Sequence, residues 1–412
     1  PERQARSLDP QERPLAIPAA AALNPERPMQ LITTTDELRA AVDRVSQGQF
    51  VTVDTEFMRE STYWPKLCLL QFAGSNEEGG HLVDPLAPGL DLAPFIALLD
   101  RPDIVKVFHA ARQDIEIFFN LSGRTPKNLF DTQIAGMVCG LGESISYENL
   151  VRETSGHAVD KSSRFTDWSR RPLSEKQLVY ALGDVTHLRD AYRWLSEKIS
   201  TRGRAEWIAE EMAVLTDPAT YGTDPDESWR RLKVRSGSKK FLSVLKTLAA
   251  WREREAQTRD LPRQRVLKDD ALLDVASHAP KTVAELDGLR SIPRGFAQSR
   301  SGAAILEAIA AGLALPHDQV PQLERHERLP ETDSGLVDAL KLLLKLKADE
   351  AEVAPRLIAN AADMERIAAY GTPDVAAMQG WRRDVFGAAA LDLKAGKLSL
   401  KIKDGKLTAE AV

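Results

Sequence analysis

The side chains best suited to chemistry are two acids inside a run of β-forming residues. Asp54 and Glu56 interrupt FVTVDTEF at residues 50–57. Side chains at i and i+2 leave the same face of a strand, so both carboxylates should point together while Thr55 points away. Like charges placed side by side repel each other, and a cation between them is the usual remedy. The pair therefore predicts a cation site on a strand.

Two more acids follow later in the chain. Asp114 lies in a helical run after an apolar strand that ends near His109, and ligands gather beyond the carboxyl ends of strands in α/β sheets. Tyr180 and Asp184 lie four residues apart on one helical face beside an apolar stripe, where an unpaired acid is costly. Pairing of Asp184 with Arg189 or with an inner lysine is the structural alternative. An HD-type hydrolase at His109 and Asp114 is disfavoured, because the seven histidines do not cluster.

Periodicity places these acids in an α/β fold. We expect strands at residues 50–57, 66–73, 80–84 and 104–108. We expect helices at 35–47, 91–100, 110–122, 131–140, 146–155 and 174–200. Strands followed by strand–helix alternation indicate a mixed sheet covered by helices. After residue 201 the pattern is helical, with no strand until the last fifteen residues. Domain boundaries are expected near 202 and 319–331.

Composition excludes several classes of protein. Hydrophobic residues make up 43% and charged residues 28%, as in ordinary globular proteins, and no apolar run is long enough to span a bilayer. The two cysteines, Cys68 and Cys139, lack CxxC spacing. They exclude a disulfide scaffold and a cysteine zinc site, and they suit a cytoplasmic protein. Residues 1–28, rich in Pro, Ala, Arg and Glu, are expected to be a flexible extension.

Charge is distributed unevenly along the chain. The net charge is −5, yet residues 229–268 hold 13 Lys/Arg against 3 Asp/Glu. An acidic body with one basic stretch suggests a polyanionic partner, although a solvated helix face is an equal alternative. The candidate phosphate contacts are Lys239, Lys240, Arg263 and Arg265.

The order Asp-x-Glu, Asp, Tyr-x-x-x-Asp resembles the tyrosine-bearing branch of the DEDD exonuclease superfamily. The run VDKSSRFTDWSRRPLSEKQLVYALGDVTHL (residues 159–188) resembles the ribonuclease D family signature, although YALGD stands where the family often has small alanines. The segments SWRRLKVR, LAAWREREAQTRDLPRQRVLKDDAL and GWRRDVFG resemble that family's two HRDC-type helical domains. The resemblance covers nearly everything from residue 29 to about residue 400.

The resemblance implies a ribonuclease-H-like mixed sheet with flanking helices, followed by two all-α helical domains. The implied organisation is a flexible extension (1–28), a 3′→5′ exonuclease domain (29–201), a helical linker (202–236), a first HRDC-type domain (237–318), a linker (319–331) and a second HRDC-type domain (332–412).

It also implies a 3′→5′ exoribonuclease that releases nucleoside 5′-monophosphates. Four oxygen ligands, Asp54, Glu56, Asp114 and Asp184, suit two divalent cations, Mg²⁺ or Mn²⁺, and Tyr180 would position the attacking water. The expected partner is RNA with a single-stranded 3′ end, such as tRNA precursors and small structured RNAs, bound by a monomer away from any membrane. Two alternatives remain: an inactive nucleic-acid-binding scaffold, which would not need all four acids, and an exonuclease that acts on DNA.

Five other residues are candidates for supporting roles. Asp131 is expected to cap the helix that follows it, with a fifth catalytic carboxylate as the alternative. Gln71 and His109 are expected to line the nucleotide pocket. Lys161 and Arg164 are expected to contact substrate phosphate, although a solvated loop is equally consistent with their positions.

Overall fold

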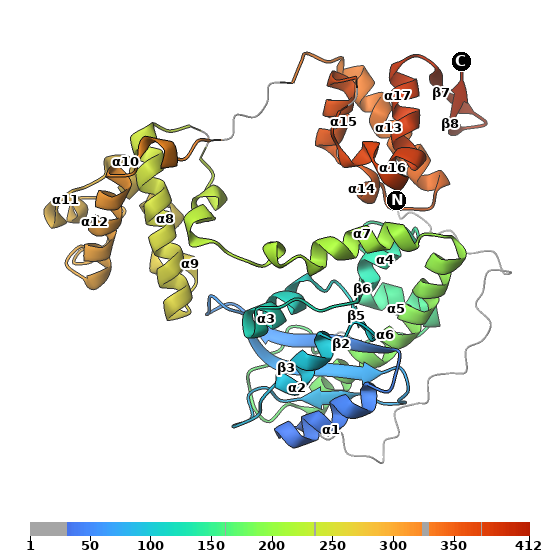
Figure 1. The fold of residues 1–412 in the computed structure, drawn as a ribbon, viewed down its shortest axis with the longest axis horizontal. Helices are drawn as coiled ribbons and strands as arrows, with labels where there is room; N and C mark the ends of the chain where they lie inside the picture. The colour runs from blue at the N-terminus through green and yellow to red at the C-terminus, as the bar shows by residue number, and fades with distance from the viewer. Residues whose placement is uncertain (1–30, 161, 235, 324–328, 372) are drawn as a thin grey trace.

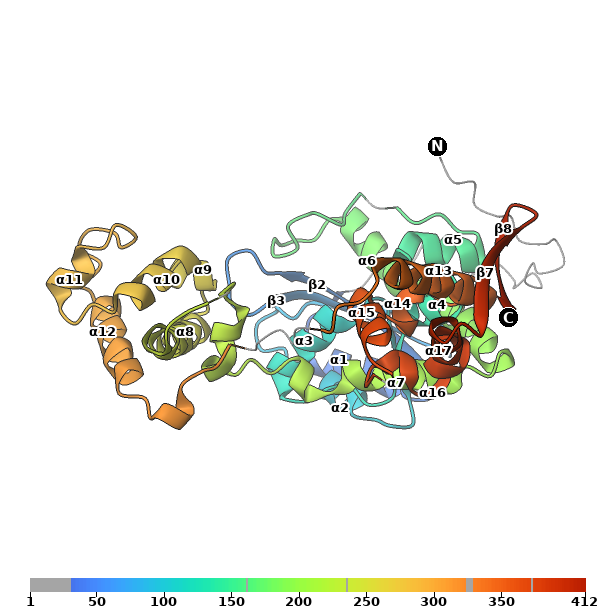
Figure 2. The ribbon, with the colours of Figure 1, turned by 90° about the horizontal axis from the view of Figure 1, so that it is seen from above.

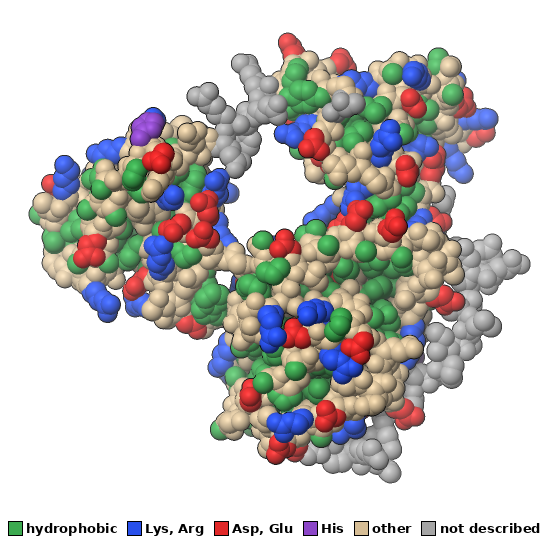
Figure 3. Space-filling model, viewed as in Figure 1, with side chains coloured by type: hydrophobic (Ala, Val, Ile, Leu, Met, Phe, Trp, Pro, Cys, Tyr) green, Lys and Arg blue, Asp and Glu red, His purple; other side chains and the backbone are tan. Residues whose placement is uncertain are grey.

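Three bodies surround an opening in the computed structural model of the chain (Figures 1 and 3). The structure describes residues 31–160, 162–234, 236–323, 329–371 and 373–412. Within them an α/β domain is followed by a helical module at one end of the molecule and by a second, C-terminal module beside the α/β domain (Figure 1). The predicted order of an α/β fold followed by helices is confirmed. The predicted extension, residues 1–28, lies outside the described part of the chain.

The described part of the α/β domain contains one mixed sheet of six strands in the order β1-β4-β3-β2-β5-β6. The strands are β1 (Leu31–Ile32), β2 (Phe50–Met58), β3 (Lys66–Gly74), β4 (His81–Val83), β5 (Val105–Phe108) and β6 (Leu129–Asp131). Strand β2 pairs antiparallel with β3 and parallel with β5, so it lies inside the sheet. Strands β1 and β6 were not predicted, because two or three residues are too few to show an alternating pattern.

All six predicted helices of this domain are present, with ends shifted by a few residues. They are α1 (Thr35–Val45), α2 (Ala93–Leu99), α3 (Arg112–Ser122), α4 (Thr132–Val138), α5 (Tyr147–Ser155) and α6 (Glu175–Thr201). Helix α6 begins at a capping box formed by Ser174 and Gln177. It crosses β2, where the Thr52 hydroxyl donates to the Val185 carbonyl at 2.7 Å. This bond fixes the residue next to Asp184 against the strand that carries Asp54.

The C-terminal module shares a buried core with the α/β domain. Helix α7 (Ala205–Thr216) lies in the segment predicted as a linker and packs between them (Figures 1 and 2). The Trp207 ring stacks on the Trp381 ring with centroids 4.1 Å apart, and Arg382 pairs with Glu210 and Glu211. The module comprises α13 (Ser334–Glu350), α14 (Pro355–Ile358), α15 (Ala361–Ala369), α16 (Gly380–Arg382), a π-helical turn η6 (Arg383–Gly387), α17 (Ala388–Lys394), β7 (Leu398–Lys403) and β8 (Lys406–Ala411). The last two pair antiparallel, in the final fifteen residues where strand was expected.

The first helical module has a separate core centred on α8. Its elements are η3 (Pro225–Arg231), α8 (Lys239–Arg259), α9 (Arg263–Val266), α10 (Asp269–His278), α11 (Val283–Asp287) and α12 (Arg300–Leu313). Both views place it at one end of the molecule, apart from the C-terminal module (Figures 1 and 2). Among the described residues, none of the helices is both long and apolar enough to cross a membrane.

The stacked tryptophans generate a stability prediction. Replacing Trp381 by Ala removes a ring that is only 8% exposed and leaves Trp207 without its partner. We expect the free energy of unfolding to fall by about 3 kcal/mol, as for other buried aromatic truncations. Ile402→Ala is the control, because that side chain is 72% exposed. Equal denaturation midpoints for the two variants in urea would contradict the shared core.

Candidate active site

Three of the predicted acids meet above β2. Asp54, Glu56 and Asp184 each offer a carboxylate oxygen, and these oxygens lie within 4.8 Å of one another. The first two are half-buried on one face of β2, and α6 supplies the third, which is 8% exposed. The prediction that Asp54 and Glu56 point together is therefore confirmed. Oxygen ligands in this arrangement suit a hard divalent cation and not Zn²⁺, which prefers nitrogen and sulfur.

Asp114 approaches the cluster from the first turn of α3. Its buried carboxylate accepts a hydrogen bond from the Thr55 hydroxyl, which leaves β2 on the face opposite to Asp54. The sequence predicted correctly that Thr55 points away from Asp54 but missed this contact. Asp114 nevertheless lies close enough to Asp54 for the Asp54 charge to raise the pKa of Asp114. The acids therefore approach β2 from both of its faces.

The Asp131 carboxylate stabilises the turn that precedes Asp114 in the chain. Its carboxylate accepts from the Gln133 and Ile134 amides of α4, which confirms the predicted cap. It also accepts from the amides of Ala110 and Ala111 at 3.1 and 2.8 Å. Ala110 has φ of 58°, a left-handed conformation that is costly for a non-glycine residue. These bonds stabilise the sharp turn between β5 and α3.

The electrostatics of the cluster favour a cation. Burial raises the pKa of Asp54 to about 7. Burial, followed by the charges of Asp54 and Asp184, raises the pKa of Glu56 to about 10. Burial and then the Asp54 carboxylate raise the pKa of both Asp114 and Asp184 well above the ordinary value. Four acids that resist ionisation together are stabilised when positive charge is placed among them.

Tyr180 lies one turn before Asp184 on α6, close enough for its hydroxyl to lower the pKa of that carboxylate. Burial, and then the negative charges of Asp184 and Glu56, raise the pKa of the phenol further above its usual value. The hydroxyl therefore keeps its proton at neutral pH. It can orient a water molecule but cannot act as a free base.

Two further side chains resolve alternatives left open by the sequence. The Arg189 guanidinium donates to the carbonyls of a turn between β3 and β4, at residues 74, 77, 78 and 79, so it does not neutralise Asp184. The Gln71 amide donates to Asp54 at 2.8 Å. Because Gln71 is fully buried, the expectation that it contacts substrate has to be revised. Its position suits orientation of the Asp54 carboxylate.

The loop before α6 adds a basic and an aromatic side chain. The Arg164 charge acts on both Glu56 and Asp184, which places it at the edge of the cluster. Its guanidinium lies 5.3 Å from the centre of the Phe165 ring, which is 92% exposed. Phe165 could not be predicted, since a lone aromatic residue in a polar loop shows no periodicity. Lys161 lies outside the described residues. His109 contacts the Thr132 hydroxyl through Nδ1 at 3.0 Å and is not among the grouped ligand residues.

Several basic side chains of residues 229–268 are already paired within the protein, so fewer are available to a ligand than the charge count suggests. Arg263 forms a bidentate ion pair with buried Glu253, so the expectation that it is available to substrate has to be revised. Lys239 contacts His317 at 2.6 Å. Within the described residues, Lys240 and Arg265 are exposed and have no ion-pair partner. Elsewhere in the stretch, arginines pair with acids before or after it, as Arg252 does with Asp269 and Arg254 with Asp226.

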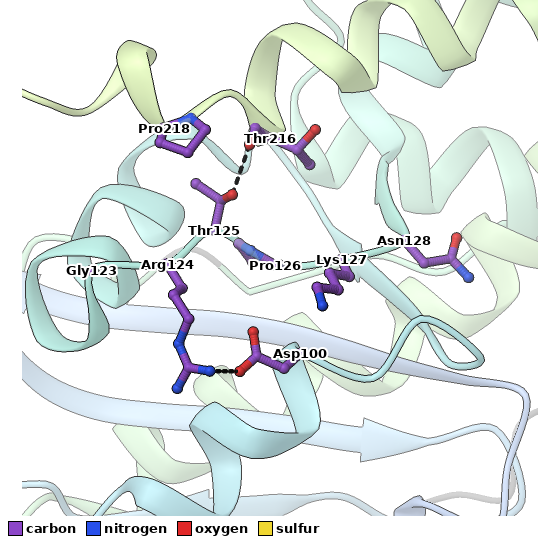
Figure 4. Close-up of a pocket in the computed structure, with 9 residues that line it drawn as sticks. All are labelled: Asp100, Gly123, Arg124, Thr125, Pro126, Lys127, Asn128, Thr216 and Pro218. Atoms are coloured by element: carbon purple, nitrogen blue, oxygen red, sulfur yellow. Dashed lines mark hydrogen bonds and ion pairs between the residues drawn. The ribbon is translucent and has the colours of Figure 1, made fainter.

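A separate cavity of about 650 Å³ lies on the α/β domain beside the loop between α3 and β6 (Figure 4). Its one carboxylate, Asp100, pairs with Arg124, and the Thr125 hydroxyl donates to the Thr216 carbonyl at 2.7 Å. None of the clustered acids lines it. This cavity is therefore separate from the candidate active site, despite its volume.

Comparison with known proteins agrees with this site. The model of a 3′–5′ exonuclease family matches residues 29–200, and the HRDC domain model matches residues 241–309. The chain is 50% identical to ribonuclease D of Gluconacetobacter diazotrophicus over 90% of its own length and 94% of that relative. It is also 50% identical to ribonuclease D of Nitrobacter hamburgensis, over 92% of this chain and 98% of that one. The chain belongs to the ribonuclease D family.

A solved member of the ribonuclease D family has the same fold. The crystal structure of Escherichia coli RNase D matches with a TM-score of 0.76 and 29% identity, covering 90% of this chain and 99% of that one. The chain is therefore an enzyme, a nuclease with a 3′–5′ exonuclease domain. The match to the HRDC model at residues 241–309 supports one such domain. The assignment of a second to residues 332–412 stays a prediction.

The repulsion among the acids predicts a pH-dependent effect of metal. Carboxyl groups whose folded-state pKa is raised hold protons that the unfolded chain releases, so stability without cation falls as pH rises through about 7, the pKa of Asp54. A cation relieves this repulsion. We therefore expect Mg²⁺, compared with chelator, to raise the melting temperature more at about pH 8 than at about pH 6.

Asp54→Asn serves as the comparison for this measurement. It removes one of the repelling charges, so the variant should melt higher than the parent in chelator and gain less from Mg²⁺. A melting-temperature gain that is equal at both pH values in the parent protein would contradict the electrostatic account of the cluster.

Proposed function

We propose that the chain is a two-metal-ion 3′→5′ exoribonuclease that releases nucleoside 5′-monophosphates. The observation that supports this best is the meeting of Asp54, Glu56 and Asp184 above β2, with Asp114 reaching Asp54 from α3. This donor set consists only of oxygen, which fits Mg²⁺ or Mn²⁺.

The position of Asp54 supports two cations over one. Of the surrounding charges, that of Asp54 does most to raise the pKa of Asp114 and of Asp184. Asp54 would therefore help to hold both ions, together with Glu56, Asp114 and Asp184. When bound, the cations would polarise the attacking water and neutralise charge on the departing oxygen.

The protein's own residues would orient the reactants around these ions. Gln71 holds Asp54 through its amide, and Thr55 holds Asp114 through its hydroxyl. Tyr180, still protonated, would position the attacking water. Arg164 would contact a phosphate of the substrate, and the exposed Phe165 ring beside it offers a surface on which a base can stack.

The proposed substrates are RNAs with a single-stranded 3′ end, including tRNA precursors and small structured RNAs. The Escherichia coli relative is described as an exoribonuclease involved in structured RNA processing, which supports this choice. Lys239, Lys240 and Arg265 of the first helical module would contact RNA phosphates without reading sequence. The C-terminal module, proposed as a second HRDC-type domain, would hold the α/β domain in place and line the opening seen in Figure 3. We propose that the enzyme acts as a monomer.

Catalysis should depend on the acids and on divalent cations. Asp54→Asn should reduce cleavage of single-stranded RNA by about 10³-fold or more, because one ligand is shared by both proposed ions. RNA affinity should stay similar or rise, since a negative charge facing phosphate is lost. Release of nucleotides from 5′-labelled RNA would be followed with Mg²⁺ and with chelator. Asp43→Asn, an exposed acid on α1, is the matched control. Undiminished cleavage in chelator would contradict the metal mechanism.

Tyr180→Phe separates positioning from metal binding. Loss of the hydroxyl should lower kcat by about 10- to 100-fold, the range typical of one positioning or proton-transfer group. The Mg²⁺ concentration that gives half-maximal rate should stay the same, because Asp184 remains. Full turnover by the variant would contradict the role proposed for the tyrosine.

A further inference from the structure

The tip of the hairpin between β2 and β3 docks onto the first helical module. The Tyr63 and Trp64 amides donate to the Asp260 carboxylate at 3.0 and 2.9 Å. The Trp64 indole donates to the Gln257 carbonyl at 3.3 Å, and the Tyr63 hydroxyl bonds to Glu253. The strand that carries Asp54 and Glu56 thus continues into a turn held by the helical module. The α/β domain and the first helical module therefore share an interface at this hairpin, which we call the seam.

Two cavities adjoin each other in this seam, and arginines line both. One has a volume of about 220 Å³ and the other of about 350 Å³. The arginines come from five separate segments: the hairpin tip, α3, η3, α8 and α9. They are Arg59, Arg112, Arg231, Arg252 and Arg263. Arg59, Arg231 and Arg263 border both cavities, so the two form one connected basic site.

The carboxylates of the seam neutralise only part of this charge. Three acids line the cavities, and each already has its own arginine. The pairs are Glu116 with Arg59, Glu253 with Arg263, and Asp269 with Arg252. Among the described residues, Arg112 and Arg231 have no carboxylate partner, and Arg231 makes only a 3.4 Å contact with the Thr223 hydroxyl. The buried Nε of Arg252 also lacks a partner. Two positive charges are left for an external anion.

The chemistry of the site fits a phosphate group. A guanidinium presents its N–H groups in a planar fork that matches the oxygens of a phosphate, and it binds them more specifically than an ammonium does. Two guanidinium groups without counter-charge repel each other, so an anion between them is stabilising. The cavity of about 220 Å³ has room for one phosphate with several waters, since each water takes about 30 Å³.

The site is distinct from the acid cluster, although one helix serves both. Arg112 and Asp114 lie two residues apart on α3, about 3 Å along its axis, and such side chains leave on nearly opposite sides. Glu116 lies one turn after Arg112 and lines the same cavity. Asp114 faces Thr55 and the cluster instead. A phosphate in the seam is therefore not the phosphate under attack.

We propose that the arginine-lined seam binds a backbone phosphate of the RNA substrate other than the scissile one. The proposal rests on the exoribonuclease function proposed above. A phosphate held by arginines of both bodies would link RNA binding to the contact between the catalytic domain and the helical module. Free phosphate has the same chemistry, so the experiment must separate the two sources.

The test is the double variant Arg112→Gln/Arg231→Gln in the full chain. Affinity for a single-stranded RNA is measured by anisotropy in chelator, so that the RNA stays intact, at several salt concentrations. We expect affinity to fall about tenfold and the salt slope to flatten by about 0.7 for one lost contact to a single strand. The control is Arg290→Gln/Arg356→Gln, which removes the same charge from exposed positions. Arg112→Lys/Arg231→Lys should recover part of the loss.

A second arm uses inorganic phosphate alone. It should raise the melting temperature of the parent and control proteins more than that of the double glutamine variant. If only this difference appears and RNA binding matches the control, the site binds free phosphate and the RNA assignment is overturned. If the double variant matches the control in both arms, there is no phosphate site in the seam. Failure of the parent protein to bind or degrade any RNA would instead overturn the proposed function, and the phosphate arm would still report on the seam.

Discussion

Repulsion among four partly or fully buried carboxylates is the constraint around which the α/β domain is organised. The nearby arginines relieve it only in part. Arg189 is bound to backbone carbonyls, and Arg164, at the edge of the cluster, lowers the raised pKa of Glu56 and of Asp184 without restoring the ordinary value. Neutral donors, the Thr55 hydroxyl and the Gln71 amide, orient the acids without neutralising them. A cluster built in this way leaves its carboxylates available to a cation, because no internal salt bridge occupies them.

The parts of this arrangement that depend on local pattern could be predicted. Strand alternation placed Asp54 and Glu56 on one face, and the four-residue spacing of Tyr180 and Asp184 placed them on one side of α6. The hydrogen bonds that hold these side chains in place join residues far apart in sequence, such as Thr55 and Asp114. Such bonds cannot be predicted from residue type or from spacing along the chain. The short strands β1 and β6 were missed for a related reason, because their pairing partners define them and their own composition does not.

The count of charged residues along the sequence predicted the free positive surface less well than periodicity predicted the site residues. The basic stretch drew attention to the first helical module, where the HRDC match lies. It could not show that Arg252 and Arg254 pair with Asp269 and Asp226, which lie outside the stretch. Pairing depends on the folded path of the chain, so a local excess of charge overstates the free positive surface. Lysines and arginines also differ, since the planar guanidinium is the better partner for buried carboxylates.

The same hairpin that carries the ligands joins the two bodies, and this has a mechanical consequence. Strand β2 runs from the sheet interior through Asp54 and Glu56 to a turn whose amides are fixed by Asp260 at the end of α8. A strand anchored at both ends has little freedom to relax when its acids repel each other. The helical module, which binds at the far end of that strand, therefore helps to hold the carboxylates close together.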